Sequence, residues 1–259
     1  MNPREFHFNR RWPVRTGFSL VELLVVMAVI GVLAGLLLPV LTRGKLLARR
    51  TACASNLHQL SIAASLYWED NCGRCFRVSD GPANNGTLWW FGWLDNTRPE
   101  GQRAFDLSTG RLYPYLRGSD VRLCPSLDPA AAPFKLKASG VVYSYGYNSF
   151  LSAAQPVLAN ALPRPAETAL FADAVQVNDF QAPASRSRPM LEEWYFLDNP
   201  TNTGTAGYYP HGHFRHAGQA GVAFCDGHVG QEKMLPGSED SKMPAQRVGR
   251  FRPEILASH

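Results

Sequence analysis

The feature that most limits how this chain can fold is an apolar run near its N-terminus, residues 18–41, which reads FSLVELLVVMAVIGVLAGLLLPVL. Its 24 residues carry a single charge, Glu22. As an α-helix rising about 1.5 Å per residue, the run is roughly 36 Å long, which exceeds the bilayer's hydrocarbon thickness of about 30 Å. Helices inside globular proteins are rarely apolar on every side over such a length. The sequence therefore predicts a transmembrane helix over residues 18–41.

A cleaved secretory signal peptide is the main alternative. Such a signal has a shorter apolar stretch followed by small residues at the cleavage site. Here the run ends in Pro39-Val40-Leu41, and the small residue Gly17 stands before the run. This order disfavours an ordinary signal peptide.

The residues around Gly17 resemble a known processing site. Residues 15–22 read RTGFSLVE, and residues 1–17 carry a net charge of +3. A glycine, a phenylalanine and a glutamate four residues later, at the head of an apolar helix, resemble the site in type IV prepilins and type II secretion pseudopilins. The resemblance implies that residues 1–17 are a cytoplasmic leader, that prepilin peptidase cuts after Gly17, and that Phe18 becomes the methylated N-terminus. Pro39 also fits this family, and we expect it to bend or locally break the helix.

Glu22 needs a partner if it lies in a membrane, because an unpaired carboxylate there costs several kcal/mol. After cleavage, the nearest cation is the new amino group of Phe18, on the same chain or on a neighbouring subunit. The resemblance implies that pairing between subunits sets the register of a growing filament.

Residues 42–71 are expected to continue the helix beyond the membrane as an amphipathic segment. No proline occurs in 42–70, and apolar residues recur at mostly helical spacing. The stripe that should pack on a globular domain consists of Leu46, Leu47, Leu57, Leu60, Ile62, Leu66 and Tyr67. We place that domain at 72–232 and a peripheral tail at 233–259.

Two further segments resemble one set of prepilin-like proteins. Residues 53–60, CASNLHQL, resemble the Cys-x-x-Asn-Leu segment that follows their membrane helix, for which we favour a packing role. His216, nine intervening residues and Asp226-Gly227 match their C-terminal H-X9-DG motif. The residues themselves predict a strand at 221–225, a tight Asp-Gly turn and a returning strand from His228.

Metal binding is one alternative for this region. Asp173, after an apolar strand expected at 168–172, together with His216, Asp226 and His228 would suit a transition ion. The other alternative is structural: His216 hydrogen-bonds near the Asp-Gly turn and braces the hairpin. No cofactor is required. Cys72 and Cys75 lack the second cysteine pair that a typical zinc site of this spacing would need.

The remaining features point away from catalysis and nucleic acid. We find no GxSxG, P-loop or HExxH motif, so no enzyme is expected. The chain carries a net charge of +5, but only +2 remains without residues 1–17, which is weak for a phosphate-binding surface. The aromatic run Trp89, Trp90, Phe91 and Trp93 suits either a packed core or sugar stacking.

These observations predict an α+β, pilin-like fold: a long N-terminal transmembrane helix packed on a small antiparallel β-sheet with long loops. The expected function is a major or minor structural subunit of a type IV pilus-like filament or type II secretion pseudopilus. Its expected partners are prepilin peptidase, other subunits, an inner-membrane assembly platform and lipid. The protein would sit in the inner membrane with its C-terminal domain in the periplasm or outside the cell. The alternative is a membrane-anchored module that binds polysaccharide or another extracellular ligand.

Overall fold

The computed structural model describes residues 19–116, 118, 121–152, 157–198 and 209–257, in two compact units, 1–45 and 46–259. Gly17 and Phe18 lie outside the described residues. The helix α1 spans Leu20–Asp70 and begins in the first unit and ends in the second. It continues as a helix through Pro39, so of the two expected effects, a bend or a local break, the break is absent.

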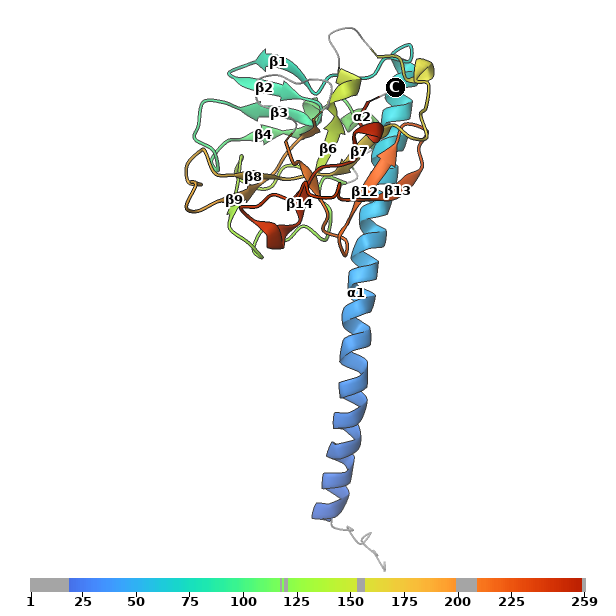
Figure 1. The fold of residues 1–259 in the computed structure, drawn as a ribbon, viewed down its shortest axis with the longest axis vertical. Coiled ribbons are helices and arrows are strands. Elements are labelled where there is room, and N and C mark those ends of the chain that lie inside the picture. The colour runs from blue at the N-terminus through green and yellow to red at the C-terminus, as the bar shows by residue number, and fades with distance from the viewer. Residues whose placement is uncertain (1–18, 117, 119–120, 153–156, 199–208, 258–259) are drawn as a thin grey trace, which may run out of the picture. The chain divides into compact units, whose positions relative to one another are not determined.

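The described residues of the second unit form four small β-sheets (Figure 1). Their strands are β1 (Ser79–Ala83), β2 (Gly86–Trp89), β3 (Gly92–Asp95), β4 (Phe105–Asp106), β5 (Phe134–Lys135), β6 (Tyr145–Asn148), β7 (Ala169–Asp173), β8 (Gln176–Asn178), β9 (Met190–Glu192), β10 (Phe196–Leu197), β11 (Gly212–His213), β12 (Gln219–Phe224), β13 (Val229–Lys233) and β14 (Val248–Gly249). Short helices are α2 (Tyr113–Leu116), η1 (Leu107–Thr109), η2 (Ser149–Ser152), η3 (Ala159–Ala161), η4 (Pro244–Gln246) and η5 (Pro253–Ile255).

The central sheet has the strand order β10-β6-β7-β12-β13. All neighbours in it are antiparallel except β10 and β6. A separate antiparallel sheet has the order β1-β2-β3-β4, and two smaller ones have the orders β5-β9-β8 and β11-β14. The α+β, pilin-like arrangement expected from the sequence is confirmed.

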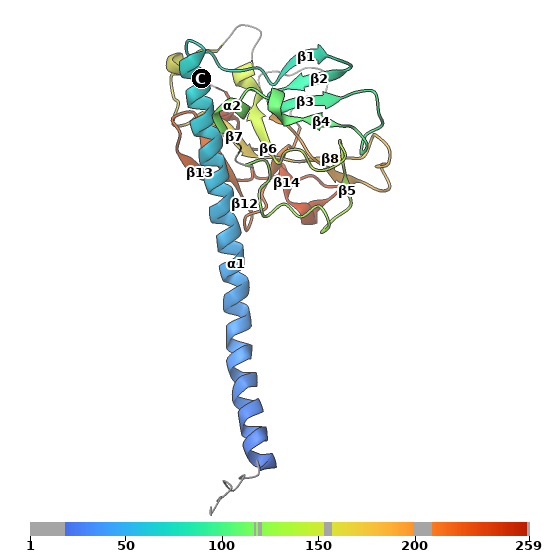
Figure 2. The same ribbon diagram turned by 180° about the vertical axis from the view of Figure 1, so that it is seen from behind.

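The C-terminal half of α1 lies beside the central sheet in both Figure 1 and Figure 2. One face of this half is buried with sheet residues such as Tyr145, Tyr147 and Phe171. The buried helix positions are Cys53, Leu57, Leu60, Ser61, Ala63, Ala64 and Trp68. Steps of three and four residues separate most of them, so they form one stripe along the helix.

The expected packing stripe was only partly right. Leu57 and Leu60 are fully buried, but Leu46, Leu47, Ile62 and Leu66 are exposed. Sequence spacing alone could not choose between two apolar faces of the same helix, and the sheet covers only one of them.

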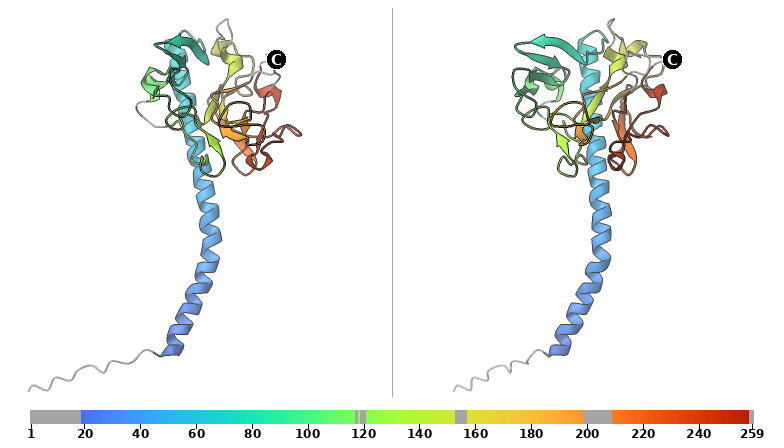
Figure 3. Two further views of the ribbon diagram at one scale, coloured as in Figure 1. Left: turned by 90° about the vertical axis from the view of Figure 1, so that its left-hand side faces the viewer. Right: turned by 60° about the vertical axis from the view of Figure 1, so that its left-hand side comes forward.

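The segment 233–259 is not a peripheral tail, which corrects the prediction. Strand β14 pairs with β11, and the side chains of Phe251, Ile255 and Leu256 are buried against Phe214 and Val222. Figure 3 shows the red C-terminal segment folded along one side of the globular unit. The segment was predicted to be peripheral because it is rich in charged residues, proline and glycine, and its few buried apolar residues do not stand out in the sequence.

Other elements are near their expected places. The strand expected at 168–172 is β7, and the hairpin around Asp226-Gly227 consists of β12 and β13. In the aromatic run, Trp90 and Phe91 are core residues, and the Trp90 indole N–H donates to the Tyr195 carbonyl at 2.7 Å.

Candidate functional site

The N-terminal end of α1 carries a capping box. The backbone N–H of Ser19 donates to Glu22 Oε2 at 2.8 Å, and the backbone N–H of Glu22 donates to Ser19 Oγ at 3.2 Å. This reciprocal pair satisfies two N–H groups that a helix start leaves free. The sequence pattern Ser-x-x-Glu at 19–22 was a signal for it that the sequence reasoning did not use.

A buried cluster of four metal-ligating side chains lies between α1 and the central sheet. It contains Cys53 from α1, Cys124 from the loop between α2 and β5, Asp173 from the end of β7, and His216 from the loop before β12. All four residues are buried, and one ligand atom from each lies within 4.8 Å of the others. In the described part of the chain, all five cysteines are free thiols.

The contacts within the cluster form a continuous network. The Cys53 thiol donates to Asp173 Oδ1 at 3.5 Å, and Cys124 Sγ lies 3.4 Å from His216 Nε2. His216 Nε2 is 3.1 Å from Asp173 Oδ2. The hydroxyl of Tyr145 donates to Cys53 Sγ at 3.5 Å.

Asp173 is held as a carboxylate inside the protein. Burial by itself raises the pKa of Asp173, but the charge of Arg215 and the contact with His216 outweigh it and lower the pKa. Arg215 Nε lies 3.6 Å from Asp173 Oδ1, and the backbone N–H of Gly221 donates to Asp173 Oδ2 at 2.8 Å. Arg215 Nη2 also donates to the carbonyls of Ser144 and Ala174, both at 3.1 Å.

The other members of the cluster respond to the same charges. Burial lowers the pKa of His216, but its hydrogen bonds with Asp173 and Cys124 raise the pKa to about 9. Hydrogen bonding to Cys53, and then to His216, lowers the pKa of Cys124. The contact with Cys124, burial and the Asp173 charge raise the pKa of Cys53. These contacts therefore favour the thiolate form of Cys124 over that of Cys53.

The structure separates the four residues named from sequence as metal candidates. Asp173 and His216 lie together, but Asp226 and His228 lie at the β12–β13 turn and bond to each other. Asp226 Oδ1 accepts from the backbone N–H of His228 at 3.1 Å and lies 2.6 Å from His228 Nδ1. This pair shapes the turn and does not belong to the buried cluster, which corrects the proposed ligand set.

The expected hydrogen bond from His216 to the Asp-Gly turn is also wrong, because its ring contacts Cys124 and Asp173. The turn instead meets α1 directly. The Gly227 carbonyl accepts from Ser61 Oγ at 3.4 Å, and His58 Nδ1 lies 3.3 Å from the same oxygen. The Asp-Gly end of the H-X9-DG motif therefore contacts α1 directly. The His216 end reaches α1 through Asp173, which contacts Cys53.

Cys53 and Cys124 are the functional candidates that sequence reasoning missed. Cys53 opens the 53–60 segment, which is the only signal that marked it. Cys124 precedes a proline and stands far from every other member of the cluster in sequence. Only the fold brings these two thiols together, whereas Cys72 is exposed and Cys75 is buried elsewhere in the aromatic core.

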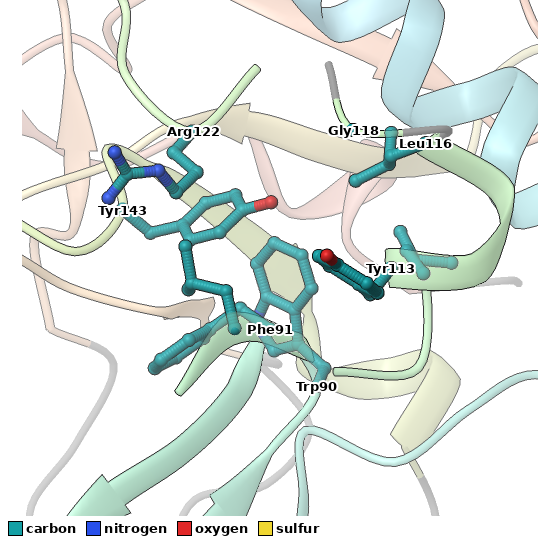
Figure 4. A pocket seen from close by; sticks show the side chains of 9 residues that line it. Trp90, Phe91, Tyr113, Leu116, Gly118, Arg122 and Tyr143 are labelled. Carbon is teal, nitrogen blue, oxygen red and sulfur yellow. The ribbon is translucent and has the colours of Figure 1, made fainter. Parts of the chain in front are cut away.

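Further pockets lie away from the cluster. Figure 4 shows one of about 250 Å³, lined by aromatic rings of Trp90, Phe91, Tyr113 and Tyr143 together with Arg122. A larger pocket of about 630 Å³ lies beside Trp194, Tyr209 and His211 and includes the carboxylates of Asp179 and Asp198.

Comparisons with known proteins bear on the N-terminus. Residues 13–38 match the prokaryotic N-terminal methylation motif, which is 26 of the 259 residues. No curated protein and no solved structure matches the chain. Helix α1 is long and apolar enough to cross a membrane, with a mean hydropathy of 2.9 over its most apolar 18 residues. The chain therefore carries a prepilin-type N-terminal methylation motif, of the kind that prepilin peptidase processes, at the head of a helix long and apolar enough to cross a membrane.

Proposed function

We propose that this chain is a structural subunit, major or minor, of a type IV pilus-like filament or a type II secretion pseudopilus. In this proposal prepilin peptidase cuts after Gly17 and methylates Phe18. The observation that carries it is the methylation motif at 13–38 at the head of a 51-residue helix. Such a subunit functions by packing against neighbouring subunits in the filament, and this function requires no catalytic group.

The exposure of α1 supports this proposal. Every described residue from 19 to 48 is exposed, including 16 large apolar side chains from Leu20 to Leu41. Burying apolar surface contributes about 25 cal/mol per Å², so this helix is stable only in lipid or against other apolar helices. An inner-membrane helix that later packs against the same helix of neighbouring subunits meets both conditions.

The H-X9-DG motif is, in this proposal, a brace that holds the C-terminal hairpin on α1. His216 meets α1 through the Cys53 cluster, and Gly227 meets it at Ser61 and His58. Cys53 and Ser61 are eight residues apart, about 12 Å along a helix. Two attachments at that spacing would keep the globular unit aligned with α1 while the filament bears load.

The location and partners follow from the same proposal. The chain spans the inner membrane once, with residues 46–259 in the periplasm or outside the cell. It contacts lipid, prepilin peptidase, other subunits and an inner-membrane assembly platform, and it has no role in binding nucleic acid.

The test is intact mass and N-terminal sequencing of membrane-extracted protein from cells with and without prepilin peptidase. We expect a chain that begins at N-methyl-Phe18 only in cells with the peptidase. Gly17→Leu should leave the chain uncut in both cells, and Gly44→Leu, which lies beyond the motif, should not. A wild-type chain that keeps Met1 in both cells would refute the proposal.

A second function, extracellular ligand binding, is favoured by the pocket beside Trp194. Tyr209 lines this pocket, Phe180 is 73% exposed at its edge, and Asp179 and Asp198 supply acceptors for sugar hydroxyls. Aromatic faces beside carboxylates suit polysaccharide. Binding of detergent-solubilised full-length protein to a glycan array, lost in Phe180→Ala and kept in Tyr113→Ala, would support this function. An array without signal would remove it.

A further inference from the structure

We propose that Cys53, Cys124, Asp173 and His216 bind one Zn²⁺ ion in a closed, four-coordinate site that fastens α1 to the central sheet.

The first argument is the spacing of the ligand atoms. Zinc binds sulfur at about 2.3 Å and nitrogen or oxygen at about 2.0–2.1 Å, so tetrahedral ligands lie about 3.3–3.8 Å from one another. The distances here are 3.5 Å from Cys53 Sγ to Asp173 Oδ1, 3.4 Å from Cys124 Sγ to His216 Nε2, and 3.1 Å from His216 Nε2 to Asp173 Oδ2. Four side chains from four separate segments thus converge, with one ligand atom from each within 4.8 Å of the others, a spacing that a small contraction around an ion would bring to the edge lengths of a zinc tetrahedron.

The donor set selects the class of metal. Two cysteine sulfurs, an imidazole nitrogen and one carboxylate suit zinc, whose structural sites are tetrahedral and mix these donors. Calcium takes six to eight oxygen ligands, and magnesium prefers octahedral oxygen. One carboxylate beside two thiols serves neither of these ions.

The charges balance when the ion is bound. Two thiolates and the Asp173 carboxylate carry three negative charges, and Zn²⁺ reduces the sum to one. Arg215 neutralises that remainder. Its side chain is only 3% exposed, and its Nε lies 3.6 Å from Asp173 Oδ1. Among the described residues its Nε and Nη1 make no hydrogen bond, so the guanidinium acts there as a charge.

Neighbouring groups hold the ligands in place. The backbone N–H of Gly221 fixes Asp173 Oδ2 at 2.8 Å, and the Tyr145 hydroxyl points at Cys53 Sγ. Asn56 Nδ2 lies 3.3 Å from that hydroxyl and also donates to the Leu123 carbonyl at 3.0 Å. Such outer contacts orient the ligands of metal sites and tune their affinity.

One side of the cluster lies close to the surface. An open hollow on the surface is lined by Cys53 and His216, together with Thr51, Val229 and Gln231. The hollow therefore brings solvent close to the side of the cluster formed by Cys53 and His216.

A disulfide between Cys53 and Cys124 is the competing chemistry, because extracytoplasmic compartments are oxidising. A disulfide requires neither His216 nor Asp173, yet both aim their ligand atoms at the two sulfurs. The convergence of all four residues favours the metal.

The test is metal analysis of full-length protein in detergent, stripped with a chelator under reducing conditions and titrated with ZnCl₂. We expect one Zn²⁺ per chain, and with CoCl₂ the visible absorption of tetrahedral, thiolate-bound Co²⁺. Cys53→Ser, Cys124→Ser and His216→Ala should each lower zinc affinity by about tenfold or more. Cys75→Ser and His228→Ala are matched controls, because these residues lie outside the cluster, and they should bind one Zn²⁺ as the wild type does.

The wild-type measurements keep the proposal testable if a variant misfolds. A reduced wild-type chain that takes up no zinc overturns it. So does a Cys53–Cys124 disulfide in protein isolated with its thiols blocked at lysis, or zinc binding lost in His228→Ala and kept in Cys124→Ser. None of these results depends on cleavage after Gly17, so they leave the filament proposal to its own test.

Discussion

At the scale of single residues, three carboxylates show how different surroundings accommodate the same chemical group. Glu22 accepts the backbone N–H of Ser19 at the start of α1. Asp173 is fully buried; Arg215 and His216 form ion-pair contacts with its carboxylate, and the backbone N–H of Gly221 donates to it. Glu193 is buried as well, but it accepts the backbone N–H groups of Lys137, Val142 and Tyr143. Their environments, and not their residue type, decide their protonation.

Glu193 provides a pH prediction. Burial raises the pKa of Glu193 to about 7 from an ordinary 4.5, although the three backbone N–H groups oppose it. The folded chain thus holds a proton between pH 4.5 and 7 that the unfolded chain has lost. This contribution to stability is full below about pH 4.5 and is lost as pH rises through 7, a change of about 3 kcal/mol.

Chemical denaturation of detergent-solubilised wild type and Glu193→Gln from pH 4.5 to 8 measures this effect. The difference in unfolding free energy should shift by about 3 kcal/mol in favour of Gln as pH rises. The exposed Glu254→Gln is the control and should follow the wild type throughout. A wild-type profile parallel to Glu193→Gln would contradict the assignment.

Two substitutions distinguish the effect of the Glu22 charge from the effect of its role in the capping box. Gln also serves at this position of a capping box, so Glu22→Gln removes the charge and keeps the cap. Ser19→Ala keeps the charge and removes a cap contribution of about 1 kcal/mol. If the charge pairs with the amino group of a neighbouring subunit, Glu22→Gln should lower incorporation into sheared filaments at least tenfold, and Ser19→Ala should leave it nearly unchanged. The reverse order would assign Glu22 to helix capping alone.

At the scale of elements, α1 is one helix that meets two environments. Its described residues up to 52 are nearly all exposed, and a narrow stripe from Cys53 to Trp68 is buried against the central sheet. The sheet approaches this stripe closely because β12 carries Gly221. A Cβ at Gly221 would lie 2.8 Å from Leu57 Cδ1 and 3.2 Å from Asp173 Oδ2.

Gly221→Ala should therefore push the helix from the sheet. We expect a loss of about 1–3 kcal/mol in unfolding free energy, the range typical of overpacking a close contact. Gly140→Ala is the control, since a Cβ there meets nothing within 4 Å, and it should change stability by less than about 0.5 kcal/mol. Equal thermal midpoints for the two variants would show that the helix–sheet contact tolerates a methyl group.

At the scale of the whole molecule, the chain divides near Lys45 into two units with separate requirements. The first unit contributes an apolar helix and no described core of its own. The second contains the helix stripe, the central sheet, the aromatic cluster around Trp90 and the four-residue Cys-His-Asp cluster.

This division predicts that residues 46–259 fold without the membrane helix. The fragment should be soluble without detergent and elute as a monomer, and its circular dichroism should show a cooperative thermal transition. The full chain should need detergent or lipid. The corresponding fragment from residue 72, which lacks the buried stripe, is the control and should aggregate. If both fragments aggregate, the second unit depends on the membrane helix for folding.

The sequence by itself determined the parts of this protein that depend on local chemistry. A membrane-length apolar run, the processing motif beside it, the strand before Asp173 and the hairpin at Asp226-Gly227 were all readable, because each rests on neighbouring residues. The tertiary structure alone decided which helix face is buried, that Phe251 and Ile255 belong to the core, and which ligands meet. Cys53, Cys124, Asp173 and His216 converge because α1 packs across a sheet whose strands are joined by long connections. Contacts between residues so far apart in the chain leave no periodic signal in it.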